Sequence, residues 1–159
     1  MKPPPHLVIC LDPYDPGIQE MAFYLRRLIL EWVPETNELI WDGYNAVSMA
    51  YSKSEKLRDA FCHIAVYKAH VNLGFNRGTE LSEDTLPLEG TGRLIRHYKV
   101  KRLDAFPVAG VKKMILEASE LSQTRNPALR IKTSTGISKV MSVSDNKIRP
   151  KKNGGLNGT

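Results

Sequence analysis

The stretch AFCHIAVYKAHVNLGFNRG, residues 60–78, decides the fold because apolar residues alternate on both sides of Lys68-Ala69. Folded back at that point, it forms a hairpin with one wholly apolar face, made by pairing Val66 with Val71, Ile64 with Leu73, and Cys62 with Phe75. The opposite face collects Tyr67 with His70, Ala65 with Asn72, and His63 with Gly74. A slip of one residue would move the apolar set to the other face, so the register is well specified. Lys-Ala is unusual in a two-residue turn, and a four-residue turn gives the same pairing.

Upstream of this hairpin, the sequence predicts a helix and then two more strands. Asp15 is the expected cap of the helix, and Pro16 suits its first turn because proline lacks the N–H that would be unpaired there. The apolar stripe of the helix consists of Ile18, Met21, Ala22, Leu25, Leu28, Ile29 and Trp32. We expect Glu20, Arg26, Arg27 and Glu31 to lie in water, and Pro34 to end the helix. ELIWD (38–42) and AVSMAYS (46–52) are the two strands, joined through GYN.

Downstream, RLIRHYKVK (93–101) predicts a further strand, in which Leu94, Tyr98 and Val100 share a face with Arg96. LDAFPVAGVKKMILEASEL (103–121) predicts a second helix, with Asp104 as its cap. The apolar stripe of this helix consists of Val108, Val111, Ile115 and Ala118.

This order of elements predicts an α+β fold. An antiparallel sheet of about five strands would carry the N-terminal and C-terminal helices on one face, and leave the other face partly solvated. We expect a single domain over residues 15–123, preceded by a proline-rich segment, 1–14, whose run Leu7–Leu11 suits a short strand or a helical turn. Residues 124–159 lose apolar periodicity and are rich in Ser, Thr, Asn, Gly and Lys, which predicts a basic, mostly disordered tail.

The net charge of +6 is concentrated in that tail. From residue 124 onward there are eight basic residues against Asp145, so the tail carries +7 and the first 123 residues carry −1. A charged, solubilising terminus is the common meaning of such a run, and non-specific contact with nucleic acid is the alternative. Cys10 and Cys62 stand in apolar runs and form no disulfide framework. With no signal-peptide core and no membrane span, the expected location is the cytoplasm.

Gly90-Thr91-Gly92 raises the question of a phosphate loop. Phosphate cradles place a glycine turn between a strand and the amino terminus of a helix, whereas here the turn leads into a strand. We therefore predict a turn whose glycines supply positive φ before the strand. The alternative is a backbone nest for an anion, assisted by Arg93, Arg96 or Arg77.

Three histidines, His63, His70 and His97, are expected on or near the solvated face. Imidazoles are common metal ligands, but these lack the spacing of a familiar zinc site, so they are more simply strand residues hydrogen-bonded to their surroundings. The acids of the loop before the glycine turn, Glu80, Glu83, Asp84 and Glu89, lack the calcium-loop pattern and suit either a solvated loop or weak iron binding through carboxylates. No Gly-x-Ser-x-Gly motif or exposed reactive cysteine indicates nucleophilic catalysis.

Three blocks together resemble the YdhG-like family, bacterial domains of unknown function: LRRLILEWVPETNELIWDGYNAVSMAYS (25–52), AFCHIAVYKAHVNLGFNRGTEL (60–81) and LEGTGRLIRHYKV (88–100). The resemblance runs from about Tyr14 to Leu121, with Arg93 where the family leads us to expect lysine. It implies a sandwich similar to frataxin, and a role as an intracellular iron chaperone has been assigned to at least one relative. Frataxin's acids lie mainly along its first helix and the adjoining sheet edge. Here that helix offers only Asp15, Glu20 and Glu31.

The sequence therefore predicts a cytosolic binding module rather than an enzyme, with a small anionic or planar ligand held on the solvated sheet face and the adjoining loop. The candidate residues are Trp41, Tyr44, His63, Tyr67, His70, Asn72, Arg77, Gly90, Gly92, Arg93, Arg96 and His97. The alternative is a frataxin-like iron chaperone that uses the four loop acids. A homodimer formed through the ring-bearing face is a further possibility, in which the same residues would form the interface.

Overall fold

The computed structural model describes residues 1–82, 86–131 and 136–150. The helices are α1 (Pro5–Leu11), α2 (Pro16–Trp32), α3 (Val108–Arg125) and α4 (Ala128–Ile131). The strands are β1 (Asn37–Asp42), β2 (Val47–Ser52), β3 (Ala60–Val66), β4 (Val71–Phe75), β5 (Arg96–Val100) and β6 (Ser138–Val143). Two short 3₁₀ helices, η1 (Leu57–Asp59) and η2 (Gly78–Glu80), complete the described elements.

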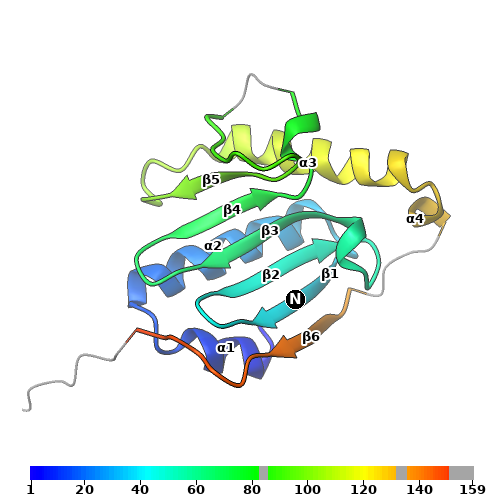
Figure 1. Cartoon of the computed structure of the whole chain (residues 1–159). Coiled ribbons are helices and arrows are strands. Elements are labelled where there is room, and N and C mark those ends of the chain that lie inside the picture. The colour runs from blue at the N-terminus through cyan, green and yellow to red at the C-terminus, as the bar shows by residue number, and fades with distance from the viewer. Residues whose placement is uncertain (83–85, 132–135, 151–159) are drawn as a thin grey trace, which may run out of the picture.

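The strands form one open sheet in the order β5-β4-β3-β2-β1-β6, with α1 and α2 behind it in the view of Figure 1. β1 to β5 pair antiparallel with their neighbours, as the sequence predicts. β6 is parallel to β1, so the sheet is mixed and has six strands, and the prediction of an antiparallel sheet of about five strands is correct only in outline.

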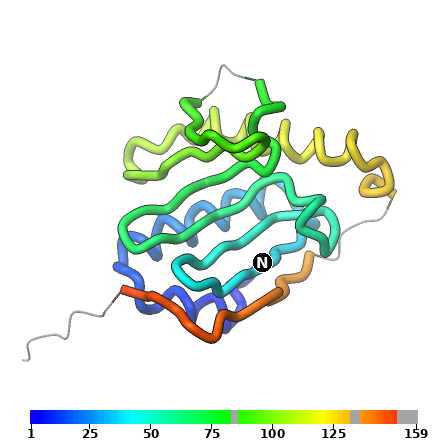
Figure 2. The backbone as a smooth tube through the Cα atoms, in the orientation of Figure 1, coloured from blue at the N-terminus to red at the C-terminus, as the bar shows by residue number. Residues whose placement is uncertain are grey.

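The β3–β4 hairpin has the predicted register, from Val66 with Val71 to Cys62 with Phe75. Val66 and Val71 lie in the main core with α2 and α3, whereas Tyr67 and His70 lie on the opposite side of the sheet. We call that opposite side the open face, and the tube in Figure 2 shows the strands of the sheet in front of α1 and α2.

α2 begins as predicted, because the Asp15 carboxylate accepts a hydrogen bond of 2.9 Å from the Gly17 N–H. Arg26, expected in water, is instead 3% exposed and forms an ion pair of 2.7 Å with Glu38 of β1, which is fully buried. The guanidinium also donates to the Met1 carbonyl oxygen at 2.8 Å, so the first residues of the chain lie against α2. Periodicity alone does not predict a buried arginine, because it does not show which acid lies opposite.

The N-terminal segment forms the helical turn that was one of its two expected conformations. Leu7 and Leu11 of α1, and Tyr14 after it, are buried in the main core. No helix among the described residues has the length and apolarity needed to cross a membrane.

α3 starts later than predicted. Asp104 was expected to cap it, but the helix begins at Val108, and the Asp104 carboxylate pairs with Arg102 on the surface. Val108 is exposed, while Val111, Ile115 and Ala118 of the predicted stripe are buried.

The segment after residue 123 contributes more structure than a mostly disordered tail would. It completes α3, forms α4 and adds β6. β6 contains an extra residue, Met141, opposite the step from Ile40 to Trp41, which is a β-bulge. The bulge breaks the alternation of Ile137, Val140, Met141 and Val143, and the strand therefore has no two-residue period in the sequence.

Candidate functional site

The rings of Tyr67 and His70 stack at the turn of the β3–β4 hairpin, with centroids 4.8 Å apart and planes 18° apart. The Tyr67 N–H donates to the His70 carbonyl oxygen at 2.9 Å, so Lys68-Ala69 is a two-residue turn. Burial, and then the charges of Lys99 and His97, lower the pKa of His70 below its ordinary 6.5. The imidazole is therefore neutral at pH 7, and the pair presents a flat, uncharged surface.

Five residues form a row across the middle of the open face, one from each of five adjacent strands. The register aligns Trp41, Ser48, Ala65, Asn72 and Lys99. We call this set the central row. Ser48 and Ala65 in the middle of the row have small side chains. They leave a shallow surface between the Trp41 indole and the Asn72 amide. The Tyr67–His70 pair lies just beyond Ala65 and Asn72 along β3 and β4.

Asn72 carries an unusual side chain for the middle of a strand. Its Oδ1 atom is buried and has no hydrogen-bond partner among the described residues. A buried carbonyl without a donor costs about 1–3 kcal/mol, so such atoms normally find a partner in protein, water or a ligand. Asn72 was predicted as a site residue, and its Oδ1 atom is a hydrogen-bond acceptor without a donor among the described residues.

His63 lies in the row next to the central row, where it pairs with Gly74. Its ring lies across Gly74, where an added Cβ would come within 2.0 Å of His63 Nε2. Its Nδ1 lies 2.9 Å from Asn76 Oδ1. Burial lowers the pKa of His63 despite that hydrogen bond, so the imidazole is neutral at pH 7. His63 therefore supports the open face as a fixed, uncharged ring.

Trp41 and Tyr44 are placed differently. Trp41 is half-buried and packs on Leu39, Ala50 and Ala60, a small apolar cluster beneath the open face. Tyr44 is exposed in the turn between β1 and β2. Since Val47 pairs with Val66, this turn and the Tyr67–His70 turn lie at the same end of the sheet.

The glycine turn lies at the other end of the sheet, where Phe75 pairs with Arg96. Gly90 has a φ of 131°, as a glycine-specific turn requires, but Gly92 has no such φ. The Arg96 guanidinium donates to the Gly92 and Ile95 carbonyl oxygens and closes the turn, while Arg77 pairs with Glu80. The structure therefore does not bring Arg77, Gly90, Gly92, Arg93 and Arg96 together with the central row.

Two of the four loop acids have partners. Glu80 pairs with Arg77, and Glu89 lies 3.6 Å from His97 while its backbone forms a β-bridge with that residue. Glu83 and Asp84 lie outside the described residues. No group of three metal-binding side chains occurs within the described ranges, and the iron-binding hypothesis stays a prediction.

The sequence reasoning missed a cluster around Asp42. This carboxylate is 2% exposed and accepts hydrogen bonds from Lys147 at 2.6 Å and from Arg149, while His6 Nε2 lies 3.5 Å away. Burial raises the pKa of Asp42, but the bonds and charges of Lys147 and Arg149 outweigh that effect and lower it. The alternation of ELIWD places Asp42 on the face of Ile40, which is the only signal that predicts its burial.

Several basic side chains of the C-terminal segment form ion pairs with acids of the domain. Lys139 pairs with Glu55, and Arg130 pairs with Glu120, in addition to the two partners of Asp42. Four of the basic residues after position 123 are thus bound to acids of the domain and do not form a free polycation.

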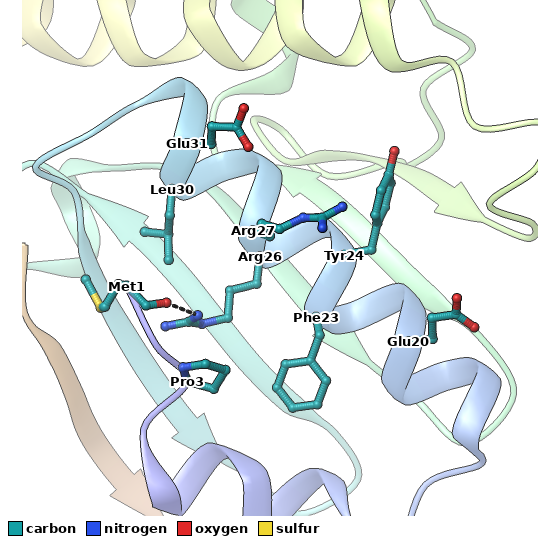
Figure 3. Close-up of a pocket in the computed structure, with 9 residues that line it drawn as sticks. All are labelled: Met1, Pro3, Glu20, Phe23, Tyr24, Arg26, Arg27, Leu30 and Glu31. Carbon is teal, nitrogen blue, oxygen red and sulfur yellow. Dashed lines mark hydrogen bonds between the residues drawn. The ribbon is translucent and has the colours of Figure 1, made fainter.

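A cavity of about 570 Å³ lies away from the open face, between the first three residues and the outer surface of α2 (Figure 3). It is lined by Met1, Pro3, Glu20, Phe23, Tyr24, Arg26, Arg27, Leu30 and Glu31, none of which was a predicted site residue. The Arg26 guanidinium is already bound to Glu38 and Met1, and the Arg27 guanidinium lies 5.4 Å from the centre of the Tyr24 ring. Both cations of the cavity are therefore engaged within the protein.

Neither thiol resembles a nucleophile. Burial raises the pKa of Cys10 to about 11 and that of Cys62 well above its ordinary value. Both groups stay protonated near pH 7, and the thiolate is the reactive form.

Comparison with protein-family models, with curated proteins and with solved structures finds no match. The resemblance to the YdhG-like family stays a prediction that rests on the sequence blocks quoted above.

Proposed function

We propose that this protein is a binding module that holds a flat heteroaromatic ligand with an anionic group on its open face. The unpartnered Asn72 carbonyl in the central row is the observation that supports this proposal most strongly. The proposal retains Trp41, Tyr67, His70 and Asn72 from the sequence prediction and adds Lys99.

The row is long enough to hold a ring together with its linked anionic group. Neighbouring strands lie about 4.8 Å apart, so the three spacings from Trp41 to Asn72 amount to about 14 Å. Ser48 and Ala65 between them leave the backbone within reach of a flat ligand. Stacking on an aromatic ring contributes about 0.5–1.5 kcal/mol beyond the area it buries. The Trp41 indole and the Tyr67–His70 pair are the surfaces available for such stacking.

Asn72 supplies selectivity. Its carbonyl oxygen is covered in the unliganded protein, and it would accept an N–H from the ligand once the side chain turns outward, while its amide group would donate to a ring nitrogen or carbonyl. A ligand that meets both groups removes the cost of the unpaired atom, whereas a purely apolar ring leaves it. This favours a heteroaromatic ligand over a hydrocarbon.

Lys99 supplies the charge. It is exposed at the β5 end of the central row, and its charge is one cause of the lowered His70 pKa. The row itself contains no carboxylate, so an anion near Lys99 meets no repulsion within it. The ligand class is therefore a ring linked to a phosphate or carboxylate.

Adenosine monophosphate is a suitable probe, with adenosine and ribose 5-phosphate as its two halves. Calorimetry on the full chain should detect binding of the whole nucleotide at millimolar concentration or below, and binding of each half roughly tenfold weaker, because a tenfold loss equals 1.4 kcal/mol. Asn72→Ala and Lys99→Met should each weaken binding by a similar factor. Lys112→Met, which changes an exposed lysine on α3, should not.

Two results would refute the proposal. One is the absence of binding by the nucleotide and by aromatic carboxylates such as indole-3-acetate. The other is binding that Asn72→Ala and Lys99→Met leave unchanged.

A further inference from the structure

The two outer edges of the sheet differ in how they are protected. At the β5 edge, the Glu89 N–H donates to the His97 carbonyl oxygen at 2.8 Å, and the His97 N–H donates to the Glu89 carbonyl oxygen at 2.9 Å. Lys99 and Lys101 follow, and both are exposed. A covered backbone and exposed lysines are common means of preventing edge-to-edge association.

The β6 edge has less protection. β6 pairs with β1 on its inner side, and no strand among the described residues pairs with its outer side. The Ile137 carbonyl oxygen and the Ser144 N–H both bond to β1. Alternate residues of a parallel strand direct their backbone groups to opposite sides. The N–H groups of Val140 and Val143 therefore point outward.

Exposed apolar side chains gather at this edge. Of the fourteen large apolar side chains that are exposed in the described residues, eight belong to the first nine residues or to 137–148. They are Met1, Val8, Ile9, Ile137, Val140, Met141, Val143 and Ile148. Figure 1 shows α1 and β6 at the same edge, and the contact of His6 with Asp42 joins α1 to the end of β1. Such a concentration exceeds the scattered apolar residues that an ordinary surface shows.

We infer that the β6 edge is the contact between two copies of this chain, which pair their β6 strands antiparallel about a two-fold axis. A second copy is a suitable partner because this edge is nearly uncharged. Each chain carries a net charge of +6, but little of that charge lies in β6. Lys139 is the only charged residue in β6, and its ammonium is bound to Glu55. Two such edges meet without repulsion, and a two-fold contact of like patches closes after one pairing. The protected β5 edge prevents continued growth.

The pairing has a consequence for the open face. Antiparallel strands related by a two-fold axis keep the same face of the sheet on the same side. The dimer would carry both open faces on one side of a twelve-stranded sheet. The bulge at Met141 interrupts regular pairing, so the apolar side chains contribute much of the contact and the association depends on concentration.

Sedimentation equilibrium of the full chain over micromolar to millimolar concentration tests this inference. We expect a monomer–dimer equilibrium whose dissociation constant rises at least tenfold in Met141→Glu, because the substitution places a like charge from each copy in an apolar contact. Met141 is exposed, so the substitution leaves the monomer fold intact, as circular dichroism can verify. Leu116→Glu on α3, a similar change at an exposed site away from β6, should dimerise like the parent protein.

Hydrogen exchange identifies the contact independently. The Val140 amide should gain protection as concentration rises, while the Ser142 amide, directed to β1, should keep its protection at all concentrations. A monomer at millimolar concentration would overturn the inference. So would a dimer that Met141→Glu leaves unchanged, or one in which only amides away from β6 gain protection. None of these results depends on ligand binding, so the inferred dimer and the proposed binding function are tested independently of each other.

Discussion

Replacing Arg26 by methionine should destabilise the protein severely, although Arg26 belongs to a helix face that the sequence places in water. The side chain is 3% exposed, and its guanidinium bonds to both carboxylate oxygens of Glu38, at 2.7 and 3.1 Å. Methionine keeps most of the alkyl volume but removes the charge. Glu38 would then be a buried carboxylate with only the hydroxyls of Tyr51, at 3.0 Å, and Ser138, at 2.7 Å, as donors.

Breaking a buried ion pair by removing one partner costs about 3–5 kcal/mol. The two hydroxyls partly compensate Glu38, so we expect Arg26→Met to lie near the lower limit, about 3 kcal/mol. Glu38→Gln should cost a similar amount. The double variant should cost less than the sum of the two, because the second change removes the charge that the first left unpaired. Urea unfolding followed by circular dichroism gives all three free energies.

The control is Arg102→Met, which removes an ion pair with Asp104 whose members are both exposed. Its stability should not change measurably, since exposed pairs contribute little. The reasoning would be refuted if Arg26→Met behaved like this control, or if the two single changes were additive.

Three further predictions rest on other contacts of the structure. Gly74→Ala should displace the His63 ring and break its bond to Asn76, which costs about 1 kcal/mol; proton NMR should show the His63 pKa rising toward 6.5, and an unchanged His63 titration would contradict the geometry. The pKa of Asp42 is lowered by folding, so its contribution to stability is complete above the ordinary value of 3.8 and is lost as the pH falls through the lower folded value. Stability should accordingly fall with acid less steeply in Asp42→Asn than in the parent, and equal slopes would exclude this role. Cys10 and Cys62 should react slowly with a disulfide reagent at pH 8 and at once in denaturant, because both thiols are buried and protonated; rapid labelling of the folded protein would show that the burial is wrong.

The hairpin at residues 60–78 shows which parts of this fold are predictable from sequence. Its register follows from local alternation, and the capped start of α2 follows from Asp15 and Pro16, so neither depends on distant parts of the chain. β6 was missed because its bulge removes the two-residue period and its polar partners, Glu38 and Asp42, lie about a hundred residues away. Arg26 was misplaced for the same reason, since only the fold brings Glu38 opposite to it.

The residues of the candidate site likewise divide into those that local sequence places correctly and those that it does not. Tyr67, His70 and Asn72 lie on one face because they share a hairpin, and their role as ligand-binding residues stays a prediction. The arginines and glycines of the 90–96 turn were grouped with them by residue type alone. The structure places that turn at the far end of β5, with Arg96 bound to the turn's own carbonyl oxygens.

The most direct test of the binding proposal is the side-chain amide signal of Asn72 in a nitrogen–proton NMR spectrum, followed as adenosine monophosphate is added. The account predicts a saturable shift of that amide, together with the Trp41 indole N–H and the His70 ring protons, while the signals of Gly90, Gly92 and Arg96 in the glycine turn stay in place. If the Asn72 and Trp41 signals remained unmoved while the nucleotide bound elsewhere, the open face would not be the ligand site.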